Sequence, residues 1–291
     1  MNRLARLVLR PGSPRRQGGG LHLRQRLLGE LRRSLPRRRY ITTSAAAFGV
    51  FVLAWSLATY SGLLDPFFLP KPSAVVGKLV HLVVQENFLI DVRASVLRIC
   101  GGFALAALAA IPLGILAGSY PKVDALISPF SAFLRYMPAT AFVPLLILWF
   151  GIGDAEKMAV IFLGTFFYVL VLITDAAAAV EMSLLETSYT LGATQWQTLR
   201  RVVLPAMAPD IVNSLKAMIG AAWTYLIVAE LVAADKGMGR VIAKAGDWLK
   251  TDTVMAGIMA VGIIGIVTNV AFELISFTAF PWRRAHKAAE S

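Results

Sequence analysis

Six stretches of this chain are almost free of charged residues, and each is close to the length that crosses a lipid bilayer. They cover residues 40–64, 99–121, 136–153, 158–174, 217–234 and 253–272. Five contain no charge, and the fifth in order is interrupted only by Glu230. A helix needs about 20 apolar residues to cross a hydrocarbon core of roughly 30 Å, whereas the helices of a soluble protein carry charges along one face. The pattern predicts an all-α fold, a polytopic membrane bundle of six transmembrane helices.

The composition supports this class and excludes several others. Of the 291 residues, 57% are hydrophobic and 16% are charged, which is too apolar for a disordered chain and unusual for a soluble domain. The one cysteine, Cys100, cannot form an intrachain disulfide. The sequence shows no cluster with metal-ligand spacing and no nucleophile–base arrangement. We therefore expect no catalytic residues, no metal and no cofactor.

The basic charge is concentrated at the N-terminus. Residues 1–39 hold twelve arginines and one acid, so they carry +11 of the net charge of +12. The positive-inside rule places this tail in the cytoplasm, and six spans return the tail at 281–291 to the same side. We interpret residues 1–39 as a disordered extension that is attracted to anionic lipid, rather than as a nucleic-acid binder. The placement of Arg3, Arg6 and Arg10 on one helical face also resembles a transit peptide.

The segment 65–94 is expected to be an external connector between the first span and a core domain at 95–280. It contains three prolines within seven residues, from Pro66 to Pro72, which favours an extended chain. Ser73 is then placed to cap a short interfacial helix at about 74–90.

The long loop at 181–210 reads as two short helices separated by a glycine. Gly192 permits the left-handed turn that ends the first helix, and Thr194 with Gln197 forms a capping box for the second. Pro205 is expected to stop that helix. The second helix carries an apolar stripe at helical spacing, formed by Trp196, Leu199 and Val203.

This loop resembles the "EAA" loop of bacterial ATP-binding-cassette importer permeases, whose pattern is E-A-A-x3-G-x9-I-x-L-P. Glu186, Gly192 and the Leu204-Pro205 pair match at the family spacing, whereas Thr187-Ser188 replaces the two alanines and Val202 replaces isoleucine. The resemblance extends over residues 65–282. Four further motifs resemble the subfamily that imports nitrate, sulfonates, taurine or bicarbonate: Leu69-Pro70-x-Pro72-Ser73, Arg135-x-x-Pro138-x-x-Ala141-x-x-Pro144-Leu145, Trp149-Phe150-Gly151-Ile152-Gly153 and Ala229-Glu230.

The resemblance implies a type I importer permease in a bacterial inner membrane. It also implies partners: cytoplasmic ATPase subunits, a second permease copy and an extracytoplasmic binding protein. The chain has no G-x-x-x-x-G-K-[ST] motif, so ATP hydrolysis is expected on another chain. The residues expected to couple to the ATPase are Glu186, Thr187, Ser188, Gly192, Trp196, Leu199, Arg200, Leu204 and Pro205.

A translocation pathway is expected where polar or bulky residues lie inside the spans. Pro138 and Pro144 should kink the third span, and intramembrane polar residues usually face protein or water. The candidates are Met137, Thr140, Trp149, Tyr168, Trp223 and Glu230. Packing within the bundle is the alternative for each of them. An anionic solute needs cationic or N–H donors, and the sequence shows no cationic ring at mid-membrane.

The expected function is import of a small anionic or organosulfur solute by alternating access. The alternative is an ATP-independent secondary transporter or channel, which would need internal repeats and ion-coupling carboxylates. A membrane enzyme would need a catalytic cluster near an interface, and none is visible.

Overall fold

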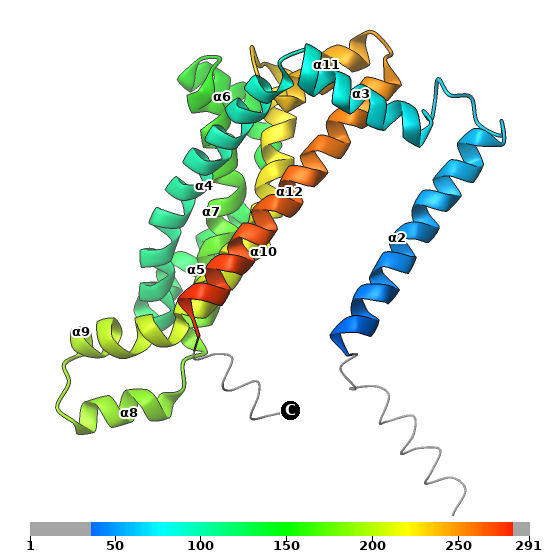
Figure 1. Ribbon diagram of the computed structural model, residues 1–291. Helices are drawn as coiled ribbons and strands as arrows, with labels where there is room; N and C mark the ends of the chain where they lie inside the picture. The colour runs from blue at the N-terminus through cyan, green and yellow to red at the C-terminus, as the bar shows by residue number, and fades with distance from the viewer. Residues whose placement is uncertain (1–35, 282–291) are drawn as a thin grey trace, which may run out of the picture. The chain divides into compact units, whose positions relative to one another are not determined.

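The computed structural model describes residues 36–281, which form helices joined by turns (Figure 1). Within this range, five helices are long and apolar enough to cross a membrane, or six if one bent pair counts as a single span. This confirms the all-α membrane fold that the uncharged runs predict. Most of the tail at 1–39 and nearly all of the tail at 281–291 lie outside the described residues. The expected disorder of the first tail and the cytoplasmic side of both tails therefore stay predictions.

The first predicted span is shifted toward the N-terminus. The chain divides into two units at residues 55 and 56, and α2 (Arg37–Tyr60) lies mostly in the first of them. We expected this helix to run to residue 64. It ends at Tyr60 because the following turn contains Gly62, whose φ of +78° is incompatible with a right-handed helix.

The connector helix α3 (Pro72–Gln85) is shorter than expected and begins differently. Lys71 is its N-cap and Pro72 its first residue, where a missing N–H costs little. The predicted cap was wrong: the Ser73 hydroxyl lies 2.6 Å from the Tyr60 hydroxyl instead of capping the helix. α3 ends before residue 90 because Asn87, with φ of 53°, separates it from α4 (Phe88–Ser119).

α4 packs along α7 (Asp154–Ala178) through a row of small residues. The row recurs at every fourth position, which places its members on one helix face: Gly102, Ala106, Ala110, Gly114 and Gly118. A Cβ at Gly114 would lie 2.8 Å from Ile173, so only glycine allows this approach. Small residues let two helix backbones pack closely where lipid provides no hydrophobic driving force.

The third span is broken rather than smoothly kinked. α5 (Pro121–Arg135) is followed by the 3₁₀ turn η1 (Ala139–Phe142) and by α6 (Val143–Phe150). The axes on either side of this break differ by 81°. The predicted distortion is confirmed at Pro138, which lacks an N–H and disfavours helix at the residue before it. The expected start at residue 136 was wrong, because α5 supplies the first half of the span.

The remaining long helices are α10 (Leu204–Val232) and α12 (Thr251–Ala279), with the short α11 (Met238–Asp247) between them. α10 contacts α7 closely at Gly164, where a Cβ would collide with the Tyr225 ring. The glycines Gly262 and Gly265 on α12 make no such close helix contact, because a Cβ at either position would meet no atom within 4 Å.

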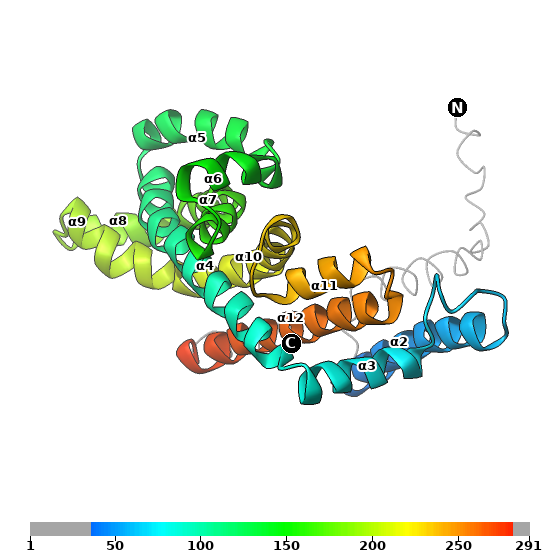
Figure 2. The same ribbon diagram turned by 90° about the horizontal axis from the view of Figure 1, so that it is seen from above.

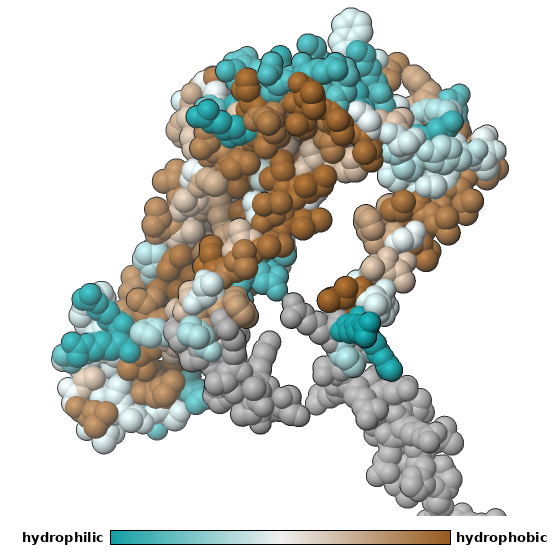
Figure 3. Space-filling model, in the orientation of Figure 1, coloured by the Kyte–Doolittle hydropathy of each residue, from teal (hydrophilic) through white to brown (hydrophobic). Residues whose placement is uncertain are grey.

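In the second unit the polar segments gather at the two ends of the helices. Figure 1 shows α3 and α11 at one end and the loop helices α8 (Met182–Thr190) and α9 (Gln195–Thr198) at the other. From above, α4 and α10 lie between the α5–α7 group and the α11–α12 pair (Figure 2). Apolar surface covers the helices between a hydrophilic cap over α11 and a second hydrophilic area at the α8–α9 loop (Figure 3). This arrangement is typical of a bundle whose sides face lipid.

Candidate functional site

The loop between α7 and α10 folds as a helix–turn–helix. α8 (Met182–Thr190) ends in a turn in which Gly192 has φ of +81° and donates its N–H to the Tyr189 carbonyl at 2.9 Å. α9 (Gln195–Thr198) begins with the predicted capping box. Its two hydrogen bonds join Thr194 and Gln197 reciprocally, at 2.9 and 3.3 Å. Both predictions for this turn are confirmed.

The second loop helix does not stop at Pro205, so that prediction was wrong. α9 continues through a π-helical turn, Leu199–Val203, directly into α10. Pro205 lies in the first turn of α10, where its missing N–H and fixed φ are tolerated. The loop is therefore joined to a transmembrane helix through continuous backbone, and the π-turn is the irregular element between them.

A buried hydrogen bond joins the two loop helices. The hydroxyls of Ser188 on α8 and Thr198 on α9 lie 2.8 Å apart, and both side chains are buried. Ser188 occupies a position where the family pattern has alanine, which has no hydroxyl for this bond. We expected Ser188 to contact the ATPase, but the structure places it inside the helix pair.

The other expected coupling residues are mostly exposed. Leu199 is buried, and so is Val203. Trp196 is 65% exposed and does not belong to the buried stripe we expected. The exposed members are Glu186, Thr187, Gly192, Trp196, Arg200, Leu204 and Pro205. Several large apolar side chains of the loop are also exposed: Met182, Leu184, Tyr189, Leu191 and Trp196.

Three of the six expected pathway residues meet at one cavity. A cavity of about 310 Å³ lies where the break after α5 faces α7 and α10, and Met137, Thr140 and Tyr168 line it. The other three do not line it. Trp149 is exposed on α6, and Trp223 is buried with its indole N–H 3.3 Å from the Thr268 hydroxyl.

The cavity wall contains hydroxyl groups and one charged residue. Tyr168 donates its hydroxyl to the Arg135 carbonyl at 3.1 Å, and Tyr225 also lines the space. The Arg135 guanidinium lies over the Tyr136 ring, 5.6 Å from its centroid. The sequence analysis named Arg135 as part of a family motif but not among the pathway residues, so it missed this placement.

Glu230, the sixth pathway candidate, lies in a buried ionic network at the end of the bundle near α11. Its carboxylate accepts from Arg98 at 2.7 Å, from Ser95 at 2.8 and 2.9 Å and from the Gly239 N–H at 2.9 Å. The Glu230 side chain is fully buried. The loop at Gly237 encloses it so closely that a Cβ there would collide with the carboxylate.

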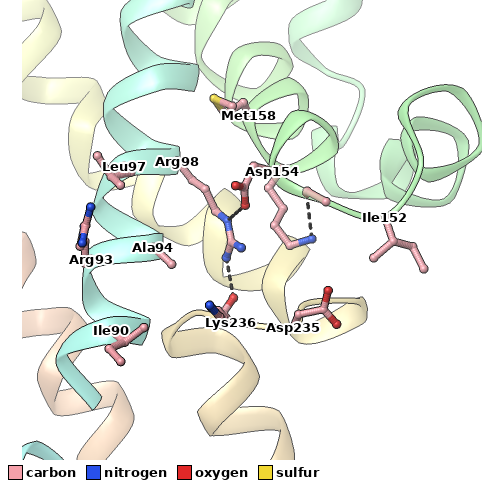
Figure 4. Close-up of a pocket in the computed structure, with 12 residues that line it drawn as sticks. Ile90, Arg93, Ala94, Leu97, Arg98, Ile152, Asp154, Met158, Asp235 and Lys236 are labelled. Atoms are coloured by element: carbon pink, nitrogen blue, oxygen red, sulfur yellow. Dashed lines mark hydrogen bonds and ion pairs between the residues drawn. The ribbon is translucent and has the colours of Figure 1, made fainter. Parts of the chain in front are cut away.

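Arg98 connects this network to two other segments. It donates to the Asp154 carboxylate at 2.7 Å and to the Lys236 carbonyl at 2.6 Å (Figure 4). It therefore ties α4 to the start of α7, to α10 and to the loop before α11. The sequence signal was available, because Arg98 directly precedes an uncharged run and Glu230 is the one acid inside a run.

A second cavity of about 510 Å³ borders this network, with Arg93 and Met158 on its walls. Among residues 36–281, no group of three or more histidine, cysteine or acidic side chains is placed to hold a metal ion.

Comparisons with known proteins agree on one kind of molecule. A family model described as "Binding-protein-dependent transport system inner membrane component" matches residues 110–278. The taurine transport system permease protein TauC of Escherichia coli K12 is 32% identical, over 85% of this chain and 92% of that protein. A putative aliphatic sulfonates transport permease protein of Bacillus subtilis is 29% identical, over 88% of this chain and 94% of that protein.

A solved structure shares the fold. A chain of the MetNI methionine ABC transporter, in an inward-facing conformation, superposes with a TM-score of 0.60 at 18% identity, covering 66% of this chain and 97% of that chain.

Proposed function

Because this chain belongs to the family of binding-protein-dependent transport system inner membrane components, we propose that it moves a small anionic or organosulfur solute by alternating access. The chain is a multi-pass inner-membrane permease of an ATP-binding-cassette importer. Its partners are ATPase subunits on the cytoplasmic side, a second permease copy and an extracytoplasmic binding protein. The names of the taurine and sulfonate relatives support the solute class.

The α8–α9 loop is the element that couples to the ATPase in this proposal. The exposed apolar side chains of the loop are the observation that carries it, because a patch of this kind on a loop outside the spans needs a partner surface. Leu191 is 83% exposed at the turn, and Trp196 is 65% exposed beside it. The Ser188–Thr198 bond keeps the helix pair rigid, so motion of the loop passes through the π-turn into α10.

Docking of this loop fixes the orientation of the chain. With α8 and α9 in the cytoplasm, both termini are also cytoplasmic, and α3 and α11 lie on the external side. The buried network of Arg98 and Glu230 then holds the external ends of the helices together. In this proposal Glu230 therefore acts as a structural residue at the end of the pathway.

The pathway runs through the cavity at the break of the third span. Helices interrupted near the middle of the membrane expose backbone and polar side chains only where they line a cavity. Met137, Thr140 and Tyr168 meet at such an interruption. A change in the angle between α5 and α6 would open or close this space, which is the conformational step that alternating access requires.

The test uses the complete transporter in proteoliposomes. In the variant Leu191→Glu, the added carboxylate would be buried at the docking surface, so ATP-driven uptake should fall at least about tenfold. Leu63→Glu is the matched control, because Leu63 is 81% exposed and lies outside the loop. Its uptake should equal that of the unmodified chain.

Two results would contradict the proposal. Equal uptake by the Leu191 and Leu63 variants would remove the docking role of the loop. Solute uptake by the permease alone, without any ATPase subunit, would favour the secondary transporter or channel.

A further inference from the structure

Arg135 lies beside the middle of α7, where its carbonyl accepts a hydrogen bond from Tyr168. It is the last residue of α5, 14 positions after Pro121. At 1.5 Å per residue, this places it about 21 Å along the helix. Tyr168, which donates to the Arg135 carbonyl, is likewise 14 residues, or about 21 Å, from the start of α7 at Asp154. Ionisable residues at this depth of a membrane protein are costly and usually serve function.

Arg135 is the one charged residue among the eleven that line the 310 Å³ cavity. Within residues 36–281 it forms no ion pair, and its recorded charge contact is with the Tyr136 ring. Arg98, the buried arginine of α4, is in contrast paired with two carboxylates. A cation without a counter-charge attracts an anion strongly in a low-dielectric environment.

The groups around Arg135 suit one kind of anion. The guanidinium offers a planar fork of donors that matches the oxygens of a carboxylate, phosphate or sulfonate group. Thr140, Tyr168 and Tyr225 add hydroxyl groups on the same wall. A volume of about 310 Å³ lies at the small end of ligand cavities, which restricts the occupant to a compact molecule.

We propose that Arg135 binds the oxyanion group of the transported solute, a sulfonate or a similarly compact single anion, at the break between α5 and α6. This assignment rests on the proposed function, since it takes the cavity as part of the pathway. It gives the permease its own selectivity for anions in addition to any selection by the binding protein. The bound anion supplies the counter-charge that Arg135 lacks among residues 36–281.

The test measures binding to the permease directly, so that the binding protein does not mask the result. The complete permease–ATPase complex in nanodiscs is titrated with ethanesulfonate, with the bound fraction followed by saturation-transfer NMR. Ethyl methyl sulfone is the matched ligand, since it has a similar size and no charge. The variants are Arg135→Gln, which removes the charge, and Arg135→Lys, which keeps it without the planar fork. Lys122→Gln on the same helix is the control, because Lys122 is exposed and outside the cavity.

We expect Arg135→Gln to weaken ethanesulfonate binding about tenfold or more, because a hydrogen bond to a charged group is lost. Arg135→Lys should weaken ethanesulfonate binding only a few-fold. That result would also show that the site remains intact when the charge is kept. The sulfone should bind equally weakly to all variants, and Lys122→Gln should bind ethanesulfonate normally.

Equal ethanesulfonate affinity in the unmodified chain and in Arg135→Gln would overturn the assignment, even if ATP-driven uptake persists. An Arg135-dependent affinity without ATP-driven uptake would support the anion site and contradict the proposed importer mechanism. The two failures are therefore distinguishable.

Discussion

Removing Arg98 should destabilise the bundle mainly by leaving Glu230 buried without a counter-charge. The Arg98 side chain is 7% exposed and the Glu230 side chain is fully buried. Arg98→Met keeps much of the volume of the side chain and deletes the cation. The carboxylate then retains only the bonds from Ser95 and from the Gly239 N–H.

The size of the effect follows from this geometry. Breaking a buried ion pair by removing one partner costs about 3–5 kcal/mol, largely because an uncompensated charge stays buried. Loss of the Arg98–Asp154 ion pair adds little to this cost, because the Asp154 side chain is 67% exposed and water can replace Arg98 there. The double variant Arg98→Met with Glu230→Gln removes the buried charge but keeps an acceptor for Gly239. The free energy of unfolding of this double variant should lie within about 1–2 kcal/mol of that of the unmodified chain.

The measurement is equilibrium unfolding in mixed micelles of mild detergent and dodecyl sulfate, followed by helical circular dichroism. Arg93→Met is the control, because Arg93 is an exposed arginine on the same helix and should change stability by no more than about 0.5 kcal/mol. A double variant as unstable as Arg98→Met alone would refute the reasoning. In that case the loss would come from the other contacts of Arg98.

Three further predictions concern segments outside the spans. Ser188→Ala should lose the hydrogen bond to Thr198 and destabilise the loop by about 1 kcal/mol. The loss should appear as faster amide hydrogen exchange in α8 and α9, and unchanged exchange would show that the bond contributes nothing to the stability of the loop. Gly192→Pro should uncouple ATP hydrolysis from uptake, because proline cannot adopt φ of +81°; normal uptake by this variant would argue against a docking role for the turn. The Lys78 ammonium, 2.8 Å away, lowers the pKa of Glu86 below its usual 4.5, so this pair stabilises the fold above pH 4.5 and the gain is lost as the pH falls through the lowered pKa. As the pair is exposed, Lys78→Met should cost less than about 1 kcal/mol at neutral pH and nothing in strong acid, and an equal thermal-melting difference at both pH values would contradict it.

The helical membrane fold and the structure of the loop were predictable because they depend on local physical chemistry, whereas the predicted count of six spans holds only if the bent α5–α6 pair is counted as one span. An uncharged run must be helical to satisfy its backbone in lipid, and the turn at Gly192 with its capping box needs only neighbouring residues. The boundaries were less predictable. Pro205 was read as a stop, yet proline is equally compatible with a first helical turn, and only the continuous π-turn distinguished the two.

Functional placement depended on residues far apart in the sequence. Glu230 and Arg98 are separated by 132 positions, and no local pattern pairs them. Arg135 looked like the flank of a span until the 81° break placed it in a cavity with Tyr168 and Tyr225. The row of small residues on α4 was visible in the sequence at a spacing of four, but only the packing showed that it faces α7.

The amino-acid sequence by itself determined that this chain is a helical membrane protein with a structured loop outside the spans, because hydropathy, capping and glycine conformation act over a few residues. The tertiary structure alone decided that Arg98 neutralises the buried Glu230 and that Arg135 lines a cavity with Tyr168 and Tyr225, because both arrangements depend on helices that meet only when the bundle has formed.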